Sequence, residues 1–235
     1  MDLVLYVPRI EASMPILRNI LLMTAKRYKA LALPLPKEFC RLAIMNPGES
    51  FGLLTGLGNS FVRLWGGWVP AFLRDIMVIE PLTTLDCYDS IDRLRRFVDL
   101  GVEIARLVIR FRLSGRVDYD EWLRLFRRNM ISLVPPDRPV VVIDDYAYFI
   151  ENYTRVSNVI LLGPLIPTPI DLVALITSGK LSIDYLAGGA VNYAISYIGG
   201  DYVVVSRDLT EAFLRLINNR EYMSFVRSAG LPIIT

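Results

Sequence analysis

The chain has 235 residues, of which 53% are hydrophobic, and this length is ample for one large domain or for two small lobes. Its 26 basic and 24 acidic residues give a net charge of +2, which lacks the basic surplus typical of nucleic-acid-binding proteins. Because the chain contains no histidine, His-dependent triads, His general bases and imidazole-based zinc sites are excluded, and we predict neither a metal nor a cofactor.

The N-terminal stretch predicts a buried strand followed by a helix. Asp2–Val7 is almost continuously apolar, and apolar residues recur at helical spacing between Met14 and Lys29. The first residues carry an early aspartate and lack both a basic region and a small-residue cleavage site. This pattern predicts no signal peptide and a cytoplasmic location.

The following segments predict short strands separated by turns, and then two helices. The strands are expected at Leu31–Leu33, Arg41–Met45, Phe61–Trp65 and Asp75–Glu80, and a short helix is expected near Ser50. From Ser90 to Leu113 the apolar residues recur every three or four positions, which predicts one long helix, and a second helix follows at Tyr119–Met130. Acidic residues interleave with the arginines of both helices, which favours solvated faces over a DNA-binding surface.

The alternation of strands and helices continues to the end of the chain. Strands are expected in the apolar run before Asp144 and at Val159–Leu162 and Tyr202–Val205, and helices at Asp171–Ser178, Ser182–Ile198, Leu209–Asn218 and Glu221–Ala229. The spacing of Asp208 and Glu211 predicts a capping pair. Despite a mean hydropathy of +0.40, no apolar window reaches the roughly 18 residues of a membrane span, because prolines and Asp171 interrupt Val159–Ile176.

These elements predict an α/β fold with mostly parallel sheets and flanking helices. Most of the strands are unbroken runs of valine, isoleucine and leucine, as in sheets that are buried on both faces. Two similar stiff connectors, "EPLTTLD" and "GPLIPTPID", each follow a predicted strand and end in aspartate before a helix. They predict two crossovers between two lobes, with lobe one at 1–82 plus 170–235 and lobe two at 83–169.

The chain resembles proteins of the type II periplasmic-binding-protein-like fold, which are two-lobed solute-binding proteins. The resemblance rests on the opening "LVLYVPRIEASMPILRN", on "VVVIDDYAYF" and on the closing "SRDLTEAFLRLINNREYMSFVRSAGLP". It implies a ligand site between the lobes. Because the chain lacks an export signal and a lipidation cysteine, cytosolic relatives are the better comparison, including menaquinone-pathway enzymes and archaeal proteins of this fold.

Two adjacent carboxylates, Asp144 and Asp145, follow the predicted buried strand. Open α/β sheets bind ligands beyond the carboxyl ends of their strands, so a carboxylate there suits an amine or a hydroxyl. The alternative is that Asp145 caps a helix that begins at Tyr146. We expect one aspartate to cap and the other to face the ligand. The stretch also resembles a Walker B strand, but no GxxxxGK[ST] motif is present, which excludes ATP hydrolysis of that kind.

Two loops are further candidates for ligand contact. The loop Pro8–Ser13 precedes the first helix, whose N-terminus suits an anion, and it contributes Arg9 and Ser13. Ser13 is equally well explained as a helix cap. The turn "NPGES" contributes Asn46 and Ser50, with a simple turn as the alternative.

Other motifs carry a weaker signal. The glycines of "TGLGNS" lack the dinucleotide-binding spacing. Trp65 and Trp68 suit core packing better than ligand stacking, although stacking stays open. Tyr146 adjoins the carboxylates and is included among the expected pocket residues.

The sequence therefore predicts a protein that binds a small polar or anionic molecule between two lobes. The first alternative is an enzyme of the same fold that acts on a small carboxylate substrate, with Asp144 or Asp145 as general base. The second is an oligomeric interaction protein, and we expect at least a dimer. Cys40 and Cys87 lack metal-site spacing and pair only if the fold brings them together. The absence of glutamine and the many arginines suggest a thermophilic source.

Overall fold

The structure is a computed structural model that describes residues 2–46, 49–50, 52–53, 61–129, 133, 136–153, 158–200 and 202–234, without the side chains of 183–185. The chain forms two compact units. Unit 1 comprises Met1–Arg95 with Ser132–Gly163, and unit 2 comprises Arg96–Ile131 with Pro164–Thr235. These boundaries differ from those of the predicted lobes because strands from both sides of residue 83 join one sheet in unit 1.

Unit 1 is built on a five-stranded parallel sheet with the strand order β3-β2-β4-β1-β5. The strands are β1 (Leu3–Tyr6), β2 (Ala30–Pro36), β3 (Thr84–Asp89), β4 (Val140–Ile143) and β5 (Val159–Leu161). All residues of β1 and β4 are buried, as their unbroken apolar sequences predict. The predicted α/β class with a parallel sheet is therefore confirmed.

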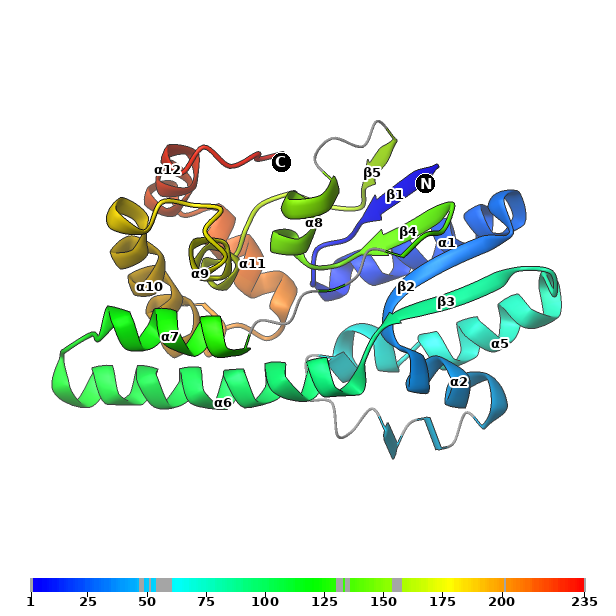
Figure 1. The fold of residues 1–235 in the computed structure, drawn as a ribbon, viewed down its shortest axis with the longest axis horizontal. Helices are drawn as coiled ribbons and strands as arrows, with labels where there is room; N and C mark the ends of the chain where they lie inside the picture. Colours follow the sequence, from blue (N-terminus) through cyan, green and yellow to red (C-terminus); the bar gives the residue numbers. More distant parts are fainter. Residues whose placement is uncertain are drawn as a thin grey trace. The chain divides into compact units, whose positions relative to one another are not determined.

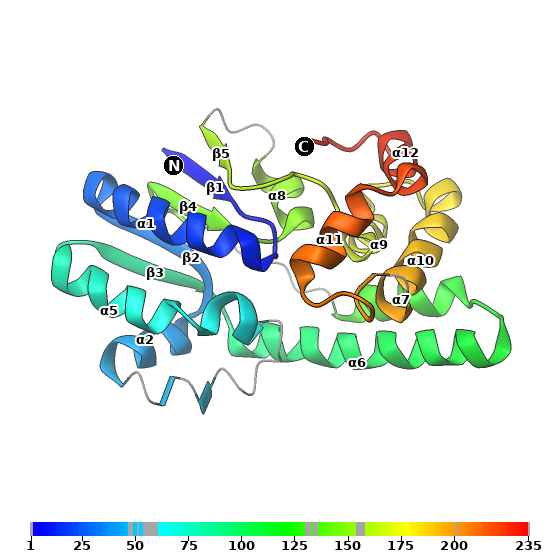
Figure 2. The same ribbon diagram turned by 180° about the vertical axis from the view of Figure 1, so that it is seen from behind.

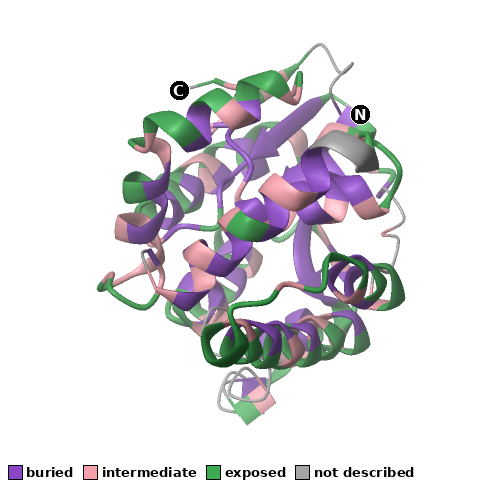
Figure 3. Ribbon diagram, turned by 90° about the vertical axis from the view of Figure 1, so that its left-hand side faces the viewer, coloured by how far each residue is buried: buried purple, intermediate pink, exposed green. Residues whose placement is uncertain are grey.

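Helices cover both faces of this sheet. Helices α1 (Met14–Tyr28) and α5 (Val69–Ile79) lie on one face, and α8 (Tyr146–Tyr153) lies on the other (Figures 1 and 2). After β1 the chain crosses to β2, and after the neighbouring strand β4 it crosses to β5. These two connections run in opposite directions across the sheet. Because crossovers between parallel strands are right-handed, the two connections must lie on opposite faces. In Figure 3 the strands are largely buried, whereas the helices carry both buried and exposed residues.

Three of the predicted strands are helical in the structure. Residues 41–45 belong to α2 (Lys37–Met45), residues 62–66 form a short π-helical turn, and residues 75–79 end α5. Short apolar runs do not separate a strand from a buried helix, and these runs pack as helix faces instead. Trp65 in the π-helical turn is buried, which confirms its assignment to core packing.

Cys40 of α2 and Cys87 of β3 form a disulfide, with Cα atoms 6.4 Å apart. Both residues are buried, and 47 positions separate them in the sequence. The cross-link joins a helix to the edge strand that it packs against. The sequence left this pairing open, and the structure resolves it.

Unit 2 is built mainly from helices in its described part. It contains most of α6 (Ile91–Ser114), together with α7 (Tyr119–Asn129), α9 (Pro169–Thr177), α10 (Ile183–Gly199), α11 (Leu209–Ile217) and α12 (Arg220–Ser228). The predictions of these helices from their apolar spacing are confirmed. The capping pair is also confirmed, because the Glu211 N–H donates to Asp208 Oδ1 over 2.7 Å.

The prediction of a strand at Tyr202–Val205 is wrong. Residues 202–205 form a turn after α10, in which the Val203 N–H donates to the Tyr197 carbonyl. The Tyr202 ring packs on Tyr197, with ring centroids 5.9 Å apart, while Val204 and Val205 are exposed. The apolar run therefore consists of Tyr202, which packs against the end of α10, and of valines that are partly or largely exposed. No helix in the described ranges is long and apolar enough to cross a membrane.

Candidate functional site

Five charged side chains meet beyond the carboxyl ends of β1, β3 and β4. They are Arg9, Asp89, Arg93, Asp144 and Asp145, and we call them the edge cluster. The carboxyl ends of parallel strands share one edge of a sheet, and ligands of open α/β sheets bind where neighbouring connections diverge. The strands β1 and β4 are such a neighbouring pair, so the edge cluster occupies the position where this architecture places ligands.

Two prolines limit the pairing of β2 with β4 beside this edge of the sheet. The pairing of β2 with β4 covers only Leu31 with Val140 and Ala32 with Val141. Beyond it, Pro34 and Pro36 have no N–H group to donate to β4. The Tyr88 hydroxyl instead donates to the Val142 carbonyl over 2.6 Å, so a side chain from β3 satisfies the backbone of β4.

The buried part of the edge cluster is organised by Arg93, in the first turn of α6. Arg93 Nη1 lies 2.6 Å from Asp89 Oδ2, and Arg93 Nη2 lies 3.4 Å from Asp145 Oδ2. The side chains of Arg93 and Asp89 are only 6% and 2% exposed. A charge removed from water to this degree is tolerated only when it is paired, so these groups depend on one another.

Asp145 serves both the fold and the edge cluster. Its Oδ1 accepts the Tyr148 N–H over 3.0 Å, which caps α8 and confirms the capping role predicted for Asp145. Its Oδ2 lies 3.4 Å from Arg93 Nη2 and 3.6 Å from Arg9 Nη2. Both oxygens are therefore engaged by groups of the protein.

Asp144 is engaged on one side only. Arg9 Nη2 lies 3.2 Å from its Oδ1, and within the described part of the chain its Oδ2 has neither a hydrogen bond nor an ion pair. The Asp144 side chain is 8% exposed, whereas that of Arg9 is 42% exposed. Asp144 is thus a nearly buried carboxylate with one oxygen open to an additional donor, beside a cation that reaches solvent.

Burial changes the protonation behaviour of groups around this edge. Burial raises the pKa of Asp89, although the neighbouring Arg93 guanidinium acts in the opposite direction. Burial and then the negative charge of Asp144 raise the pKa of Tyr88 well above its ordinary value. Burial also raises the pKa of Tyr148, whose hydroxyl lies 3.5 Å from that of Tyr153. The tyrosines therefore stay neutral and act as hydroxyl donors or acceptors.

The structure brings together some of the predicted site residues. Arg9 and Asp144 are in direct contact, and Tyr146 is buried at the start of α8. Ser13 is buried at the N-cap position of α1, but its side chain makes no capping hydrogen bond.

The remaining predicted residues lie after α2. Asn46 is the C-cap residue of this helix and is exposed, and its carbonyl accepts the Ser50 N–H over 3.2 Å. Ser50 is buried, and residues 49–50 are helical, which agrees with the short helix expected near Ser50. Residues 47 and 48 of that loop, and residues 55–60 of "TGLGNS", lie outside the described residues.

Tyr88, Asp89 and Arg93 are candidate functional residues that were not predicted from the sequence. The stretch "EPLTTLD" was predicted to be a connector, although Thr84–Asp89 is the edge strand β3. A usable signal was present in "CYDSIDR", because Ser90 caps α6 through the Arg93 N–H. Reading a strand that ends just before this cap would have placed Asp89 at the carboxyl end of a strand, on the same edge of the sheet as Asp144.

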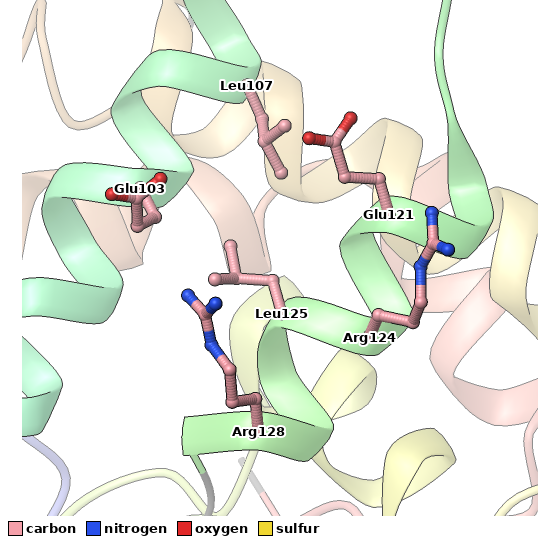
Figure 4. A pocket seen from close by; sticks show the side chains of 6 residues that line it. All are labelled: Glu103, Leu107, Glu121, Arg124, Leu125 and Arg128. Carbon is pink, nitrogen blue, oxygen red and sulfur yellow. The ribbon is translucent and has the colours of Figure 1, made fainter.

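Unit 2 has an open groove of about 430 Å³ between α6 and α7, shown in Figure 4. Its floor contains Leu107 and Leu125, and its walls carry charged residues that are exposed or half-buried. Of these, Glu103 already pairs with Arg106, and Glu121 with Arg110. Its lining in the described part of the chain includes no buried polar side chain, so the groove is a weaker candidate than the edge cluster.

Comparisons of the chain with protein-family models, with curated proteins and with solved structures gave no match. The resemblance to the type II periplasmic-binding-protein-like fold therefore stays a prediction from the sequence pattern. Inference about function has to begin from the chemistry of the edge cluster.

Replacing Asp145 with alanine should lower the free energy of unfolding by about 2 kcal/mol, the upper end of the range for a helix cap. The loss should exceed that of an ordinary cap because Oδ2 also faces two guanidinium groups. Asp208→Ala is the matched control, since Asp208 caps α11 through one backbone N–H. Urea denaturation of both variants measures the difference. Equal losses would show that the contacts of Asp145 with the arginines add no stability.

Proposed function

We propose that unit 1 binds a small polar molecule at the edge cluster, through Arg9 and Asp144. The observation that carries this proposal is the position of Asp144, whose side chain is 8% exposed, whose Oδ1 faces Arg9, and whose Oδ2 has neither a hydrogen bond nor an ion pair in the described part of the chain. A carboxylate oxygen in this position can accept a hydrogen bond from a hydroxyl or an amine of a bound molecule.

Arg9 indicates which second chemical group the ligand should carry. Its guanidinium is planar, permanently charged and 42% exposed, which suits a carboxylate or phosphate on the incoming molecule. A hydroxyl or amine on the same molecule would then meet Asp144 Oδ2. The class of ligand we propose is therefore a small hydroxy acid, amino acid or phosphorylated polyol, in keeping with a solute-binding protein.

An enzyme that uses the same site is the second candidate, and the open carboxylate oxygen also favours it. A general base must lie within hydrogen-bonding distance of the proton that it removes, and Asp144 would meet this condition for a bound hydroxyl or amine. The two functions differ in whether the bound molecule is changed, so one experiment can address both.

Screening metabolites by thermal shift should find a ligand that stabilises the wild-type chain, because a ligand at 100 times its Kd adds roughly 2.7 kcal/mol. Asp144→Asn should weaken the affinity for this ligand roughly 10- to 150-fold, as expected when a hydrogen bond to a charged group is lost. Asp92→Asn, at a side chain that is 86% exposed, is the control and should leave affinity unchanged. Calorimetric titration measures both.

The results separate the candidates. A hit that is recovered unaltered after incubation supports binding, and a hit that is converted by wild type but not by Asp144→Asn supports the enzyme. If every hit binds Asp144→Asn and Arg9→Met as tightly as it binds wild type, the proposal for the edge cluster is wrong.

A further inference from the structure

Helix α6 is apolar on two opposite faces. Leu100, Ile104, Leu107 and Val108 are buried and form its inward face. A second series lies at spacings of four, three, four and four residues on the outward face and is exposed. It consists of Val98 (38% exposed), Val102 (49%), Ala105, Ile109 (57%) and Leu113 (85%), and we call it the outer stripe.

A helix on the surface of one unit needs only one apolar face. Its other side is ordinarily polar, and single exposed apolar residues require no explanation. The outer stripe instead runs along 16 residues from Val98 to Leu113, and the 15 steps between them span about 22 Å of helix at 1.5 Å per residue. A continuous stripe of this length indicates a surface that is covered in the functional state.

We propose that the outer stripe is a dimer interface, in which α6 packs antiparallel against α6 of a second copy of this chain. The stripe is nearly symmetric about the bond between Ala105 and Arg106. A twofold axis there places Val98 opposite the partner's Leu113, and Val102 opposite the partner's Ile109. Ala105, the smallest member, falls at the axis, where two helices approach most closely.

The charges beside the outer stripe select a second copy and an antiparallel orientation. On one flank the first half of the stripe carries Asp99 and Glu103, and the second half carries Arg106 and Arg110. An antiparallel twofold pair brings this flank of both copies together and places the acidic half of each copy against the basic half of its partner. A parallel twofold pair would place the flank on opposite sides of the two copies, so these charges would not meet.

The ion pairs within the chain limit what these charges contribute. Arg106 already pairs with Glu103, and Arg110 pairs with Glu121. Contacts to the partner therefore add to existing pairs, and exposed pairs of this kind are individually weak. The apolar contacts of the outer stripe supply the affinity, and the flanking charges set the direction of the partner helix.

Sedimentation velocity between about 1 and 100 µM should show a dimer that dissociates on dilution, the range expected for a small interface. Val102→Glu combined with Ile109→Glu should give a monomer at every concentration with an unchanged circular dichroism spectrum. Val78→Glu is the matched control, because Val78 is 76% exposed on α5 in unit 1 and lies outside the outer stripe. It should leave the dimer intact.

Cross-linking tests the orientation. A mixture of Val102→Cys and Ile109→Cys chains should form an interchain disulfide under mild oxidation several-fold faster than either variant alone, because positions 102 and 109 face each other only in the antiparallel pair. A wild-type chain that is monomeric throughout, or that binds lipid vesicles through α6 without dimerising, would overturn the proposal. Equal cross-linking of each variant alone would overturn the antiparallel arrangement.

Discussion

Replacing Arg93 with methionine should lower the free energy of unfolding by about 3–5 kcal/mol, the loss expected when one partner of a buried ion pair is removed. Methionine keeps much of the side-chain volume, so the loss is mainly electrostatic. The substitution leaves Asp89, which is 2% exposed, without the guanidinium 2.6 Å away, and it removes one of the two cations beside Asp145. Chemical denaturation at neutral pH measures the loss.

Arg95→Met is the matched control for this prediction. Arg95 lies two positions along the same helix, and its side chain is 65% exposed with a single weak contact to Asp92. Its replacement should change stability by less than about 1 kcal/mol. A loss for Arg93→Met no larger than that of the control would show that the edge cluster does not depend on Arg93.

The pH dependence gives an independent check of the same interaction. Burial raises the folded-state pKa of Asp89, while Arg93 lowers it, so removing Arg93 should raise this pKa further. A raised carboxyl pKa favours the protonated folded form, and stability is then lost as pH rises from the unfolded pKa of about 3.9 through the folded pKa. The difference between wild type and Arg93→Met should therefore shrink in acid. A difference that stays constant down to pH 4 would contradict this explanation.

The helices of unit 2 were predictable because their apolar spacing is regular over many turns. In α6, Leu100, Ile104 and Leu107 recur over enough turns to overcome the unfavourable Gly101. The strands β1 and β4 were predictable because they are fully buried apolar runs. The edge strand β3 was not, because it carries Asp86 and Asp89, and charged residues are ordinary in an edge strand but also in a loop.

The candidate site shows the same limit at the level of single residues. Arg9 and Asp144 are 135 positions apart, and each was predicted separately, Arg9 from the loop before the first helix and Asp144 from its place after a buried strand. Both strands are parallel and neighbouring, so the two residues reach the same edge of the sheet. Arg93 and Asp145 are 52 positions apart, and Arg93 reaches the edge from a helix rather than from a strand. Its contact could not be predicted without knowing that Thr84–Asp89 is a strand and that α6 starts where this strand ends.

Reducing the disulfide between Cys40 and Cys87 should lower the free energy of unfolding by about 4 kcal/mol, from the chain-entropy estimate for a closed loop of this length. The two cysteines are 47 positions apart, and the closed loop contains the second half of α2, all of α5 and the first part of β3. Cross-linking removes extended conformations of this segment from the unfolded chain, and reduction returns them. The measurement compares denaturation of the wild-type chain with and without a phosphine reductant.

The Cys40→Ala/Cys87→Ala double variant separates the cross-link from the packing of the two side chains. Both cysteines are buried, so the variant also loses sulfur contacts, but the reductant should leave its denaturation curve unchanged. Because Cys87 directly precedes Tyr88 and Asp89, a weakened attachment of β3 should loosen the edge cluster as well. Hydrogen exchange at the backbone amide of Ser90, which donates to Asp89, reports on this effect. If reduction lowers the free energy of unfolding by less than about 1 kcal/mol and leaves that exchange rate unchanged, the disulfide does not hold β3 in the sheet.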